Sequence, residues 1–205
     1  MPPRTGARSA RRWTRHGHRE ASASVVGSAV LVAACIVGYA AAPPPVSSAA
    51  AFTLTSATFE NGTRIPAVHT CAGTDLSPSL KWTGAPATTR SFVLLVVDPD
   101  APGGEFVHWV VYDLPAAWRA LPSGVGPILR IGGQGGGRQG VNGFSRIGYG
   151  GPCPPPGRVH HYVFTLYALD VAQLPAPYGA TGGLVKRALQ GHILATAVLT
   201  GLFSR

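Results

Sequence analysis

The sequence predicts a mainly β domain with one short helix near the C-terminus. Charged residues make up only 12% of the 205 residues, whereas glycine occurs 27 times and proline 19 times. A soluble chain so poor in charge and so rich in turn-forming residues favours short strands and loops over a helical bundle. The length suits one domain with an appendage.

The appendage is expected at the N-terminus. Residues 1–20 contain six arginines opposed only by Glu20, and residues 21–42 contain no charged side chain. A basic n-region followed by an apolar segment is typical of an export signal, but about 20 apolar residues also suffice to span a bilayer. We therefore expect residues 1–20 to be a basic n-region and residues 21–42 to be either a cleavable signal peptide or a membrane anchor.

A third alternative for this segment is lipidation at Cys35. The residues Val32–Cys35 (VAAC) resemble the lipobox of bacterial lipoproteins, although the apolar run continues past the cysteine, where a polar tether would be typical. Residues 43–51 include three successive prolines and are expected to form an extended linker to a domain at residues 52–205. All three alternatives place this domain outside the cytoplasm, secreted or in the cell envelope, because the arginines favour the inner side of the membrane.

The net charge of +9 does not indicate a nucleic-acid partner. Residues 1–20 carry +5 of it, which leaves +4 for the remaining chain. After residue 50 there is no run of basic residues interleaved with aromatic ones, which a nucleic-acid surface would need. We expect neither a nucleic-acid partner nor a cofactor.

Two of the three cysteines, Cys71 and Cys153, lie in the domain expected outside the cytoplasm. An oxidising compartment favours a Cys71–Cys153 disulfide. The alternative is two buried free thiols that pack as small apolar side chains. Two isolated cysteines lack the spacing of a zinc site, so no metal site is expected.

Several segments of the domain show strand patterns. Alternating or apolar stretches bounded by turn residues predict strands at residues 52–59, 79–82, 91–97, 106–112 and 161–169. The segment 91–97 (SFVLLVV) is apolar on both faces, which predicts a central strand buried on both sides. Thr55, Thr58 and Thr63 are expected on edges that face solvent.

The second half of the domain contains a long loop and the predicted helix. Between Leu121 and Gly157 the composition changes to glycine and proline, including the run Gly132–Gly137 (GGQGGG). So long a segment without internal structure is often functional, and we expect it to line a site. Near-helical spacing of apolar residues predicts a short helix within 182–195, followed by a strand at 196–203.

Three polar clusters directly adjoin predicted strands: Asp98–Pro102 (DPDAP), His108–Trp109 and His160–Tyr162 (HHY). Packing of these strands would gather two imidazoles and a carboxylate. Each cluster alone has a simpler interpretation, because Asp-Pro turns often only end a strand and a lone histidine is often half-buried without a role. His160 and His161 point to opposite faces of a strand, so only one of them can face a given pocket.

The order of these motifs carries a family resemblance. The segments that carry it are Val97–Pro102 (VDPDAP), His108–Trp109, Gly148–Gly157 (GYGGPCPPPG) and His160–Asp170 (HHYVFTLYALD). They resemble the phosphatidylethanolamine-binding protein family in its bacterial Raf-kinase-inhibitor-like branch. The flanking segments His69–Pro78 (HTCAGTDLSP) and Gly191–Ala197 (GHILATA) are similar to that branch as well, and the resemblance extends over residues 52–205.

The resemblance implies two antiparallel sheets in a Greek-key-like β-sandwich, with a C-terminal helix near the mouth of a small anion pocket. It also implies which residues form that pocket: Asp98, Pro102, His108, Gly151, His160 and Tyr162. His161 is the outward neighbour at a place where the family often has arginine. One departure is Asn142–Ser145 (NGFS), where related bacterial chains more often read Asn-Asp-Phe-Gly; it puts a loop contact in doubt, not the pocket.

These residues suit an anion such as phosphate or a phospholipid head group. The two histidines and the hydroxyl of Tyr162 can donate hydrogen bonds, and Asp98 can orient a histidine by accepting from its other nitrogen. We expect a binding module, not an enzyme, whose affinity for anions weakens above neutral pH as the imidazoles lose charge. Membrane contact is expected through the N-terminal segment.

Two other functions remain open on the sequence. The histidines and aspartates could serve acid–base or metal-assisted hydrolysis, but no Gly-x-Ser-x-Gly nucleophile motif is present. The family resemblance also implies an inhibitor that acts on an enzyme through the surface around the pocket. For a domain outside the cytoplasm, a secreted or envelope peptidase is the compatible target.

Overall fold

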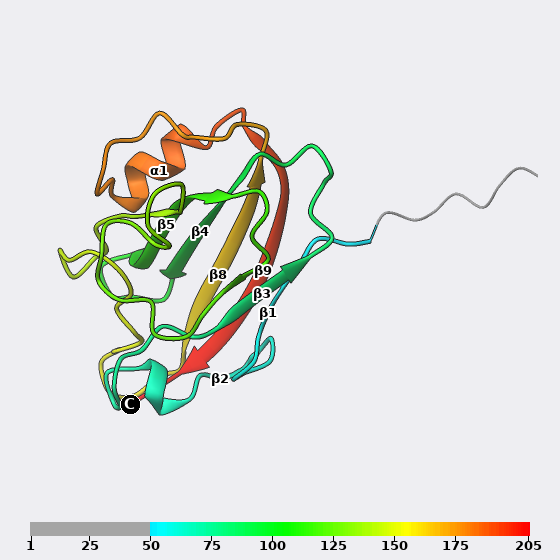
Figure 1. The fold of residues 1–205 in the computed structure, drawn as a ribbon. Helices are drawn as coiled ribbons and strands as arrows, with labels where there is room; N and C mark the ends of the chain where they lie inside the picture. Colours follow the sequence, from blue (N-terminus) through cyan, green and yellow to red (C-terminus); the bar gives the residue numbers. More distant parts are fainter. Residues whose placement is uncertain (1–49) are drawn as a thin grey trace, which may run out of the picture. The chain divides into compact units, whose positions relative to one another are not determined.

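Two β-sheets pack face to face in the computed structural model, which describes residues 50–205 (Figure 1). The smaller sheet has the order β1 (Thr53–Ser56), β3 (Leu80–Thr83) and β6 (Ala120–Leu121). The larger has the order β2 (Thr63–Arg64), β9 (Ile193–Phe203), β8 (His160–Leu169), β4 (Ser91–Asp98), β5 (Phe106–Pro115) and β7 (Arg138–Gln139). A 3₁₀ turn η1 (Ala67–His69) and one helix, α1 (Gly182–Ala188), complete the described part. The predicted mainly β fold with two sheets and a short helix is confirmed.

One pairing departs from the antiparallel expectation. The short strand β2 lies parallel to the end of β9, with Thr63 opposite Gly201, whereas the other strand pairs within residues 50–205 are antiparallel. Thr55 on β1 and Thr63 on β2 are exposed on edge strands, as predicted, and Thr58 is exposed as well.

The central strand β4 is buried on both faces, as its apolar run predicts. Leu94 and Val96 belong to the core between the two sheets, whereas Val93 and Leu95 belong to a second core on the other face. That second core is closed by α1, which contributes the fully buried Val185. Each such side chain contributes roughly 1.5–3 kcal/mol by its removal from water.

The predicted helix is correct at its start but too long. Helix α1 ends at Ala188, and β9 already begins at Ile193, inside the range predicted as helical. Gly191 has a φ of 83°, a left-handed conformation that a right-handed helix cannot continue through. Ile193 then pairs with Leu169 of β8, so sheet pairing prevails over the local helical periodicity.

The long segment from Leu121 to Gly157 is more ordered than a plain loop. It contains β7 and two isolated bridges, and the run Gly132–Gly137 turns back on itself through a hydrogen bond from Ile131 N–H to Gly137 O of 2.9 Å. Gly136 has no room for a side chain, because a Cβ there would lie 1.7 Å from Ile131 O. The glycine run is therefore a packed part of the fold.

The features expected at the N-terminus lie outside the described residues. They are the n-region at 1–20, the export or anchor segment at 21–42, lipidation at Cys35 and most of the linker at 43–51. Among residues 50–205, no helix has the length and apolar character needed to cross a bilayer.

Candidate functional site

Three neighbouring strands of the larger sheet bring the predicted polar clusters together. Asp98 ends β4, His108 lies near the start of β5, and His160 begins β8. Because β4 lies between β5 and β8 and is antiparallel to both, the end of β4 meets the starts of its two neighbours. Tyr162 follows His160 by two residues and therefore faces the same side of the sheet.

These side chains line a pocket of about 160 Å³. Five of the six predicted residues are in its lining, namely Asp98, Pro102, His108, His160 and Tyr162. His161, by contrast, is exposed, as the alternation of β8 predicts, and pairs with Asp100 at 2.7 Å. The remaining lining residues are Ala101, Phe106, Phe144, Cys153, Pro154 and Pro155.

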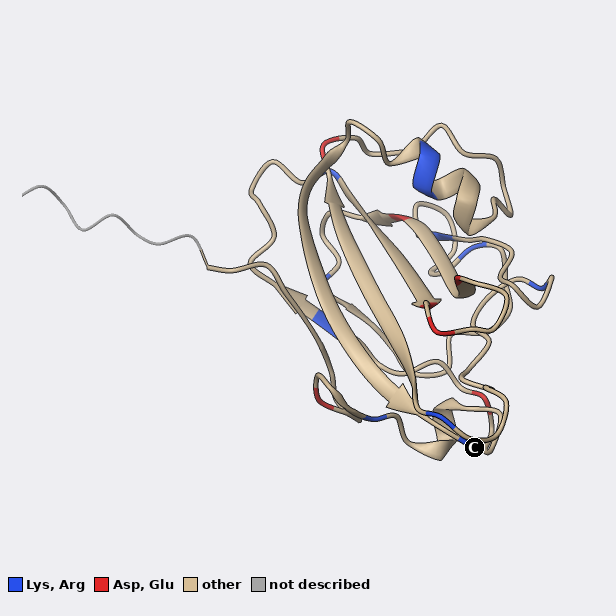
Figure 2. Ribbon diagram, turned by 180° about the vertical axis from the view of Figure 1, so that it is seen from behind, with Lys and Arg blue, Asp and Glu red and all other residues tan. Residues whose placement is uncertain are grey.

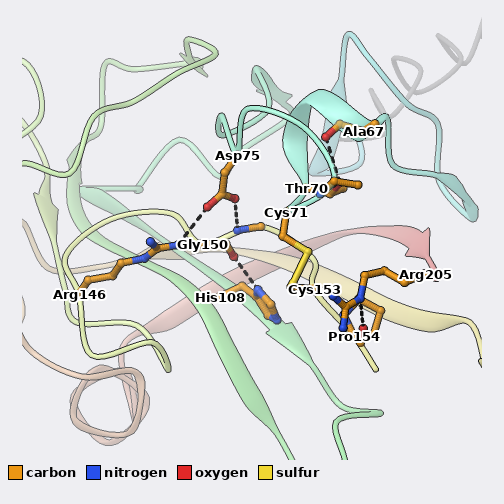
Figure 3. Close-up of a disulfide and its surroundings, with 12 residues drawn as sticks. Ala67, Thr70, Cys71, Asp75, His108, Arg146, Gly150, Cys153, Pro154 and Arg205 are labelled. Atoms are coloured by element: carbon orange, nitrogen blue, oxygen red, sulfur yellow. Dashed lines mark hydrogen bonds and ion pairs between the residues drawn. A yellow bond between two sulfur atoms is a disulfide. The ribbon is translucent and has the colours of Figure 1, made fainter. Parts of the chain in front are cut away.

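Gly151 is the predicted site residue that the structure does not place in the pocket lining. Its N–H donates to Asp75 Oδ1 at 2.6 Å, and a Cβ at this position would lie 2.4 Å from His69 O. The glycine is thus required for close packing against the segment around Asp75. Asp75 also pairs with Arg146 at 3.0 Å (Figure 3), so this carboxylate joins two segments behind the pocket.

Asp98 orients His160 in the way that its position suggests. His160 Nδ1 donates to Asp98 Oδ2 at 2.8 Å, and both side chains are almost fully buried. The other oxygen of Asp98 accepts from the backbone N–H of Asp100 at 2.8 Å, which fixes the carboxylate. In the neutral imidazole, Nε2 is then an acceptor, so His160 donates to a ligand only after it gains a proton.

His108 is held in the same way by the backbone. Its Nδ1 donates to Gly150 O at 2.6 Å (Figure 3), so the neutral ring again has an unprotonated Nε2. Burial lowers the pKa of His108, an effect that Gly150 O and the Asp98 charge oppose. Both Nδ1 protons are used within the protein, so each histidine can donate to an anion only through the Nε2–H of its imidazolium form.

The hydroxyl of Tyr162 is buried without a hydrogen-bond partner among the described residues. Burial raises the pKa of Tyr162, and the nearby Asp98 carboxylate raises it further, both by its charge and as an acceptor close to the hydroxyl, although the two groups do not meet hydrogen-bond geometry. The phenol therefore stays neutral and keeps its proton. Its ring packs edge-on against His108, with centroids 5.1 Å apart. An unpaired buried hydroxyl costs about 1–3 kcal/mol, which makes this position unusual within the core.

One wall of the pocket is fixed by the predicted disulfide. Cys71 and Cys153 are bonded, with Cα atoms 5.4 Å apart, and Cys71 N–H donates to Pro152 O at 3.1 Å (Figure 3). Arg205 Nε donates to Pro154 O at 2.6 Å from the opposite side. At the end of the segment, Gly157 N–H donates to Arg205 O at 3.3 Å, so the proline-rich segment is tied at Cys153, at Pro154 and at Gly157.

The opposite wall comes from the loop that departs from the family pattern. Phe144 lines the pocket, and its N–H donates to Asn142 Oδ1 at 2.9 Å. Phe144 packs against Phe106 with ring centroids 4.7 Å apart, and a Cβ at Gly143 would meet the Phe106 ring at 2.6 Å. Phe144 is shared with the family pattern, and the two residues that depart from it, Gly143 and Ser145, are not in the pocket lining.

Helix α1 stands beside the pocket without entering its lining. Lys186 pairs with Glu105, the residue before Phe106. Across residues 50–205 there is no group of three or more histidine, cysteine, aspartate or glutamate side chains arranged to hold a metal ion.

Comparisons with known proteins agree with the fold. The family model described as phosphatidylethanolamine-binding protein matches residues 55–204. A UPF0098 protein of Aquifex aeolicus is 46% identical over 151 residues, which cover 73% of this chain and 86% of that protein. The UPF0098 protein YbcL of Escherichia coli is 38% identical over 164 residues, covering 77% of this chain and 90% of YbcL.

The solved structures lead to the same family. The crystal structure of Escherichia coli YbcL, described as a member of the mammalian PEBP family, superposes with a TM-score of 0.69 at 37% identity. The match covers 76% of this chain and 99% of that one, so this fold forms there without a counterpart of the N-terminal segment. A homologue from Chlamydia trachomatis, CT736, has a TM-score of 0.68 at 38% identity, covering 76% of this chain and 98% of its own. This chain belongs to the phosphatidylethanolamine-binding protein family.

Proposed function

We propose that residues 52–205 form an exported binding module whose pocket holds a small anion, either phosphate or the head group of a phospholipid. The observation that carries the proposal is the set of polar groups at the pocket: two oriented histidines and a buried hydroxyl of Tyr162 that lacks a partner. Imidazolium N–H groups and a phenol O–H are donors that an anion can satisfy together.

The size of the pocket limits the ligand. Its volume of about 160 Å³ equals about five water molecules in the liquid, at roughly 30 Å³ each. A phosphate group with a short ethanolamine arm suits such a space, whereas the acyl chains of a lipid would have to remain outside. The aromatic walls of Phe106 and Phe144 keep part of the pocket apolar, which strengthens hydrogen bonds to charge inside it.

The disulfide and the N-terminal sequence support export. A Cys71–Cys153 bond is stable in oxidising compartments and rare in the cytosol. A basic segment followed by 22 uncharged residues suits an export signal or anchor. In this setting the module meets lipid head groups at the outer side of a membrane.

Calorimetric titration of residues 51–205 with phosphoethanolamine and with inorganic phosphate tests the proposal. The N-terminal segment can be omitted, because the match to YbcL shows this fold without it. Saturable heat is expected from the wild-type domain and not from a His108→Ala/His160→Ala variant. His192→Ala is the matched control, because His192 pairs with Asp170 outside the pocket.

The result also separates the ligand sources. Heat with phosphoethanolamine alone points to lipid head groups, and equal heat with both probes points to the phosphate group as the recognised part. If the wild type gives no heat with either probe, the anion-binding function is wrong, and inhibition of an extracytoplasmic peptidase is the function to test next.

A further inference from the structure

A second cavity, of about 540 Å³, lies at the other end of the central strand. Arg90, the residue before β4, lines this cavity, whereas Asp98 at the end of β4 lines the anion pocket. The eight residues of β4 correspond to about 26 Å at 3.3 Å per residue, so the two cavities are separate sites. The lining consists of Arg90, Asp113, Pro115, Ala116, Arg130, Gly135, Gly136, Arg138, Ala172, Gln173 and Tyr178.

The charges around this cavity are strongly unequal. Three arginines face a single carboxylate, that of Asp113. Charged residues are otherwise sparse on the long strands of the larger sheet (Figure 2), so this group is not part of a generally basic face.

The single negative charge of Asp113 is already paired with Arg138. It forms a largely buried ion pair with Arg138, and its second oxygen accepts from Leu174 N–H at 2.8 Å. Six ion pairs occur within residues 50–205, and neither Arg90 nor Arg130 takes part in any of them. Two guanidinium charges at the cavity therefore lack an anionic partner.

Two of the three arginines, Arg130 and Arg138, are held close to one another. Arg130 and Arg138 are directly opposite in an antiparallel bridge, a position where like charges repel. Both guanidinium groups lie over the ring of Tyr178, at 5.0 and 5.1 Å from its centroid, and Arg130 donates to the Tyr178 hydroxyl. This stacking orients the two groups without neutralising their charge.

The glycine run supplies a backbone wall to the same cavity. Gly135 and Gly136 line it, and neighbouring Gly137 is packed so closely that a Cβ would lie 2.6 Å from Leu114 Cδ2. A ligand can therefore approach main-chain atoms directly, with no side chain in between. The anion pocket at the other end of the sheet gives this run no role.

We propose that this cavity is a second binding site, for a small molecule that carries two or more phosphate or carboxylate groups. The volume lies within the range of about 300–1,000 Å³ typical of small-molecule sites. The planar fork of arginine matches both phosphate and carboxylate oxygens. Two or more anionic groups match the two guanidinium charges, those of Arg90 and Arg130, that form no ion pair among residues 50–205.

Calorimetric titration of residues 51–205 with inorganic pyrophosphate and, separately, with citrate tests this site. The key variant is Arg90→Gln/Arg130→Gln, because both side chains are exposed and neither forms an ion pair among residues 50–205; the Arg130 contact that is lost is with Tyr178, which is itself exposed. Arg138 stays unchanged, since its loss would leave Asp113 buried without a partner. Arg64→Gln removes the same kind of charge at another cavity and is the matched control.

Saturable binding of at least one probe is expected, weakened about tenfold or more in the double variant, because each lost contact joins two charged groups. Arg64→Gln should bind as the wild type does, and the His108→Ala/His160→Ala variant, in which the anion pocket is disabled, should retain saturable binding at this second site. The choice between pyrophosphate and citrate identifies the anionic group that is preferred. The site is refuted if neither probe binds saturably, if the double variant retains the affinity, or if Arg64→Gln weakens binding as much. Equal unfolding midpoints of the variants show that each one is folded.

Discussion

Raising the pH should release an anion from the pocket, because neither histidine can donate to it without an additional proton. The Nδ1 proton of His108 is used by Gly150 O, and that of His160 by Asp98 Oδ2. Only the imidazolium forms present an N–H at Nε2. Binding should therefore be coupled to proton uptake.

The size of the effect depends on the number of protons taken up. Burial lowers the pKa of His108 from its ordinary value of 6.5, so this ring is neutral in the empty pocket at neutral pH. If each bound anion requires one added proton, its affinity falls about tenfold for every unit by which the pH rises above that pKa. Over two pH units the loss is about 100-fold for the one proton taken up by His108. The affinity is thus highest in acid and falls as the pH rises.

Sulfate is a suitable probe because its charge stays constant between about pH 6 and pH 8, whereas the charge of phosphate changes in this range. Its affinity for residues 51–205 is measured by calorimetry at several pH values, in pairs of buffers with different heats of protonation, which yields the number of protons bound. His192→Ala serves as the control for histidines outside the pocket. A sulfate affinity that is constant between about pH 6 and pH 8 would refute the assignment of both Nδ1 protons.

Three substitutions test individual packing arguments by urea or thermal unfolding. Tyr162→Phe should leave the free energy of unfolding unchanged or raise it by up to about 1 kcal/mol, because the deleted hydroxyl has no hydrogen-bond partner among residues 50–205. A clear loss of stability would mean that the hydroxyl does have a hydrogen-bond partner. Gly151→Ala should lower it by about 1–3 kcal/mol, because the new Cβ would lie 2.4 Å from His69 O and 2.5 Å from Asp75 Oδ1, and an unchanged midpoint would contradict this. Ser145→Gly should raise it by about 0.5–1 kcal/mol, since Ser145 has a φ of 60°; destabilisation would mean that its side chain stabilises the loop.

Local patterns were sufficient to predict the strands that build the pocket. The apolar run of β4 predicted a strand buried on both faces, and the polar clusters at strand ends predicted where Asp98, His108 and His160 lie. They failed where pairing between distant segments decides the outcome. Residues such as Ile193 fit a helical period, but their partners on β8 draw them into a strand.

The pocket walls were harder to predict than its polar groups. Phe106, Phe144 and Pro154 carry no chemistry that marks them as site residues, and only their position in the fold brings them to the pocket. Gly151 was assigned to the ligand because glycine permits close approach, whereas the close neighbours are His69 and Asp75. The one local signal for these walls was the proline run beside Cys153.

The disulfide sets an order of events during the life of the chain. Cys71 and Cys153 are separated by 82 positions, so more than half of the domain must be synthesised before the bond can close. Until then Cys71 is a free thiol, and the proline-rich wall has no covalent tie to the segment that supports it. In the chain-entropy model, closing so long a loop lowers the conformational entropy of the unfolded chain, which stabilises the folded state by about 4–5 kcal/mol. A pocket whose proline-rich wall is covalently tied is thus one in which both thiols have already been oxidised.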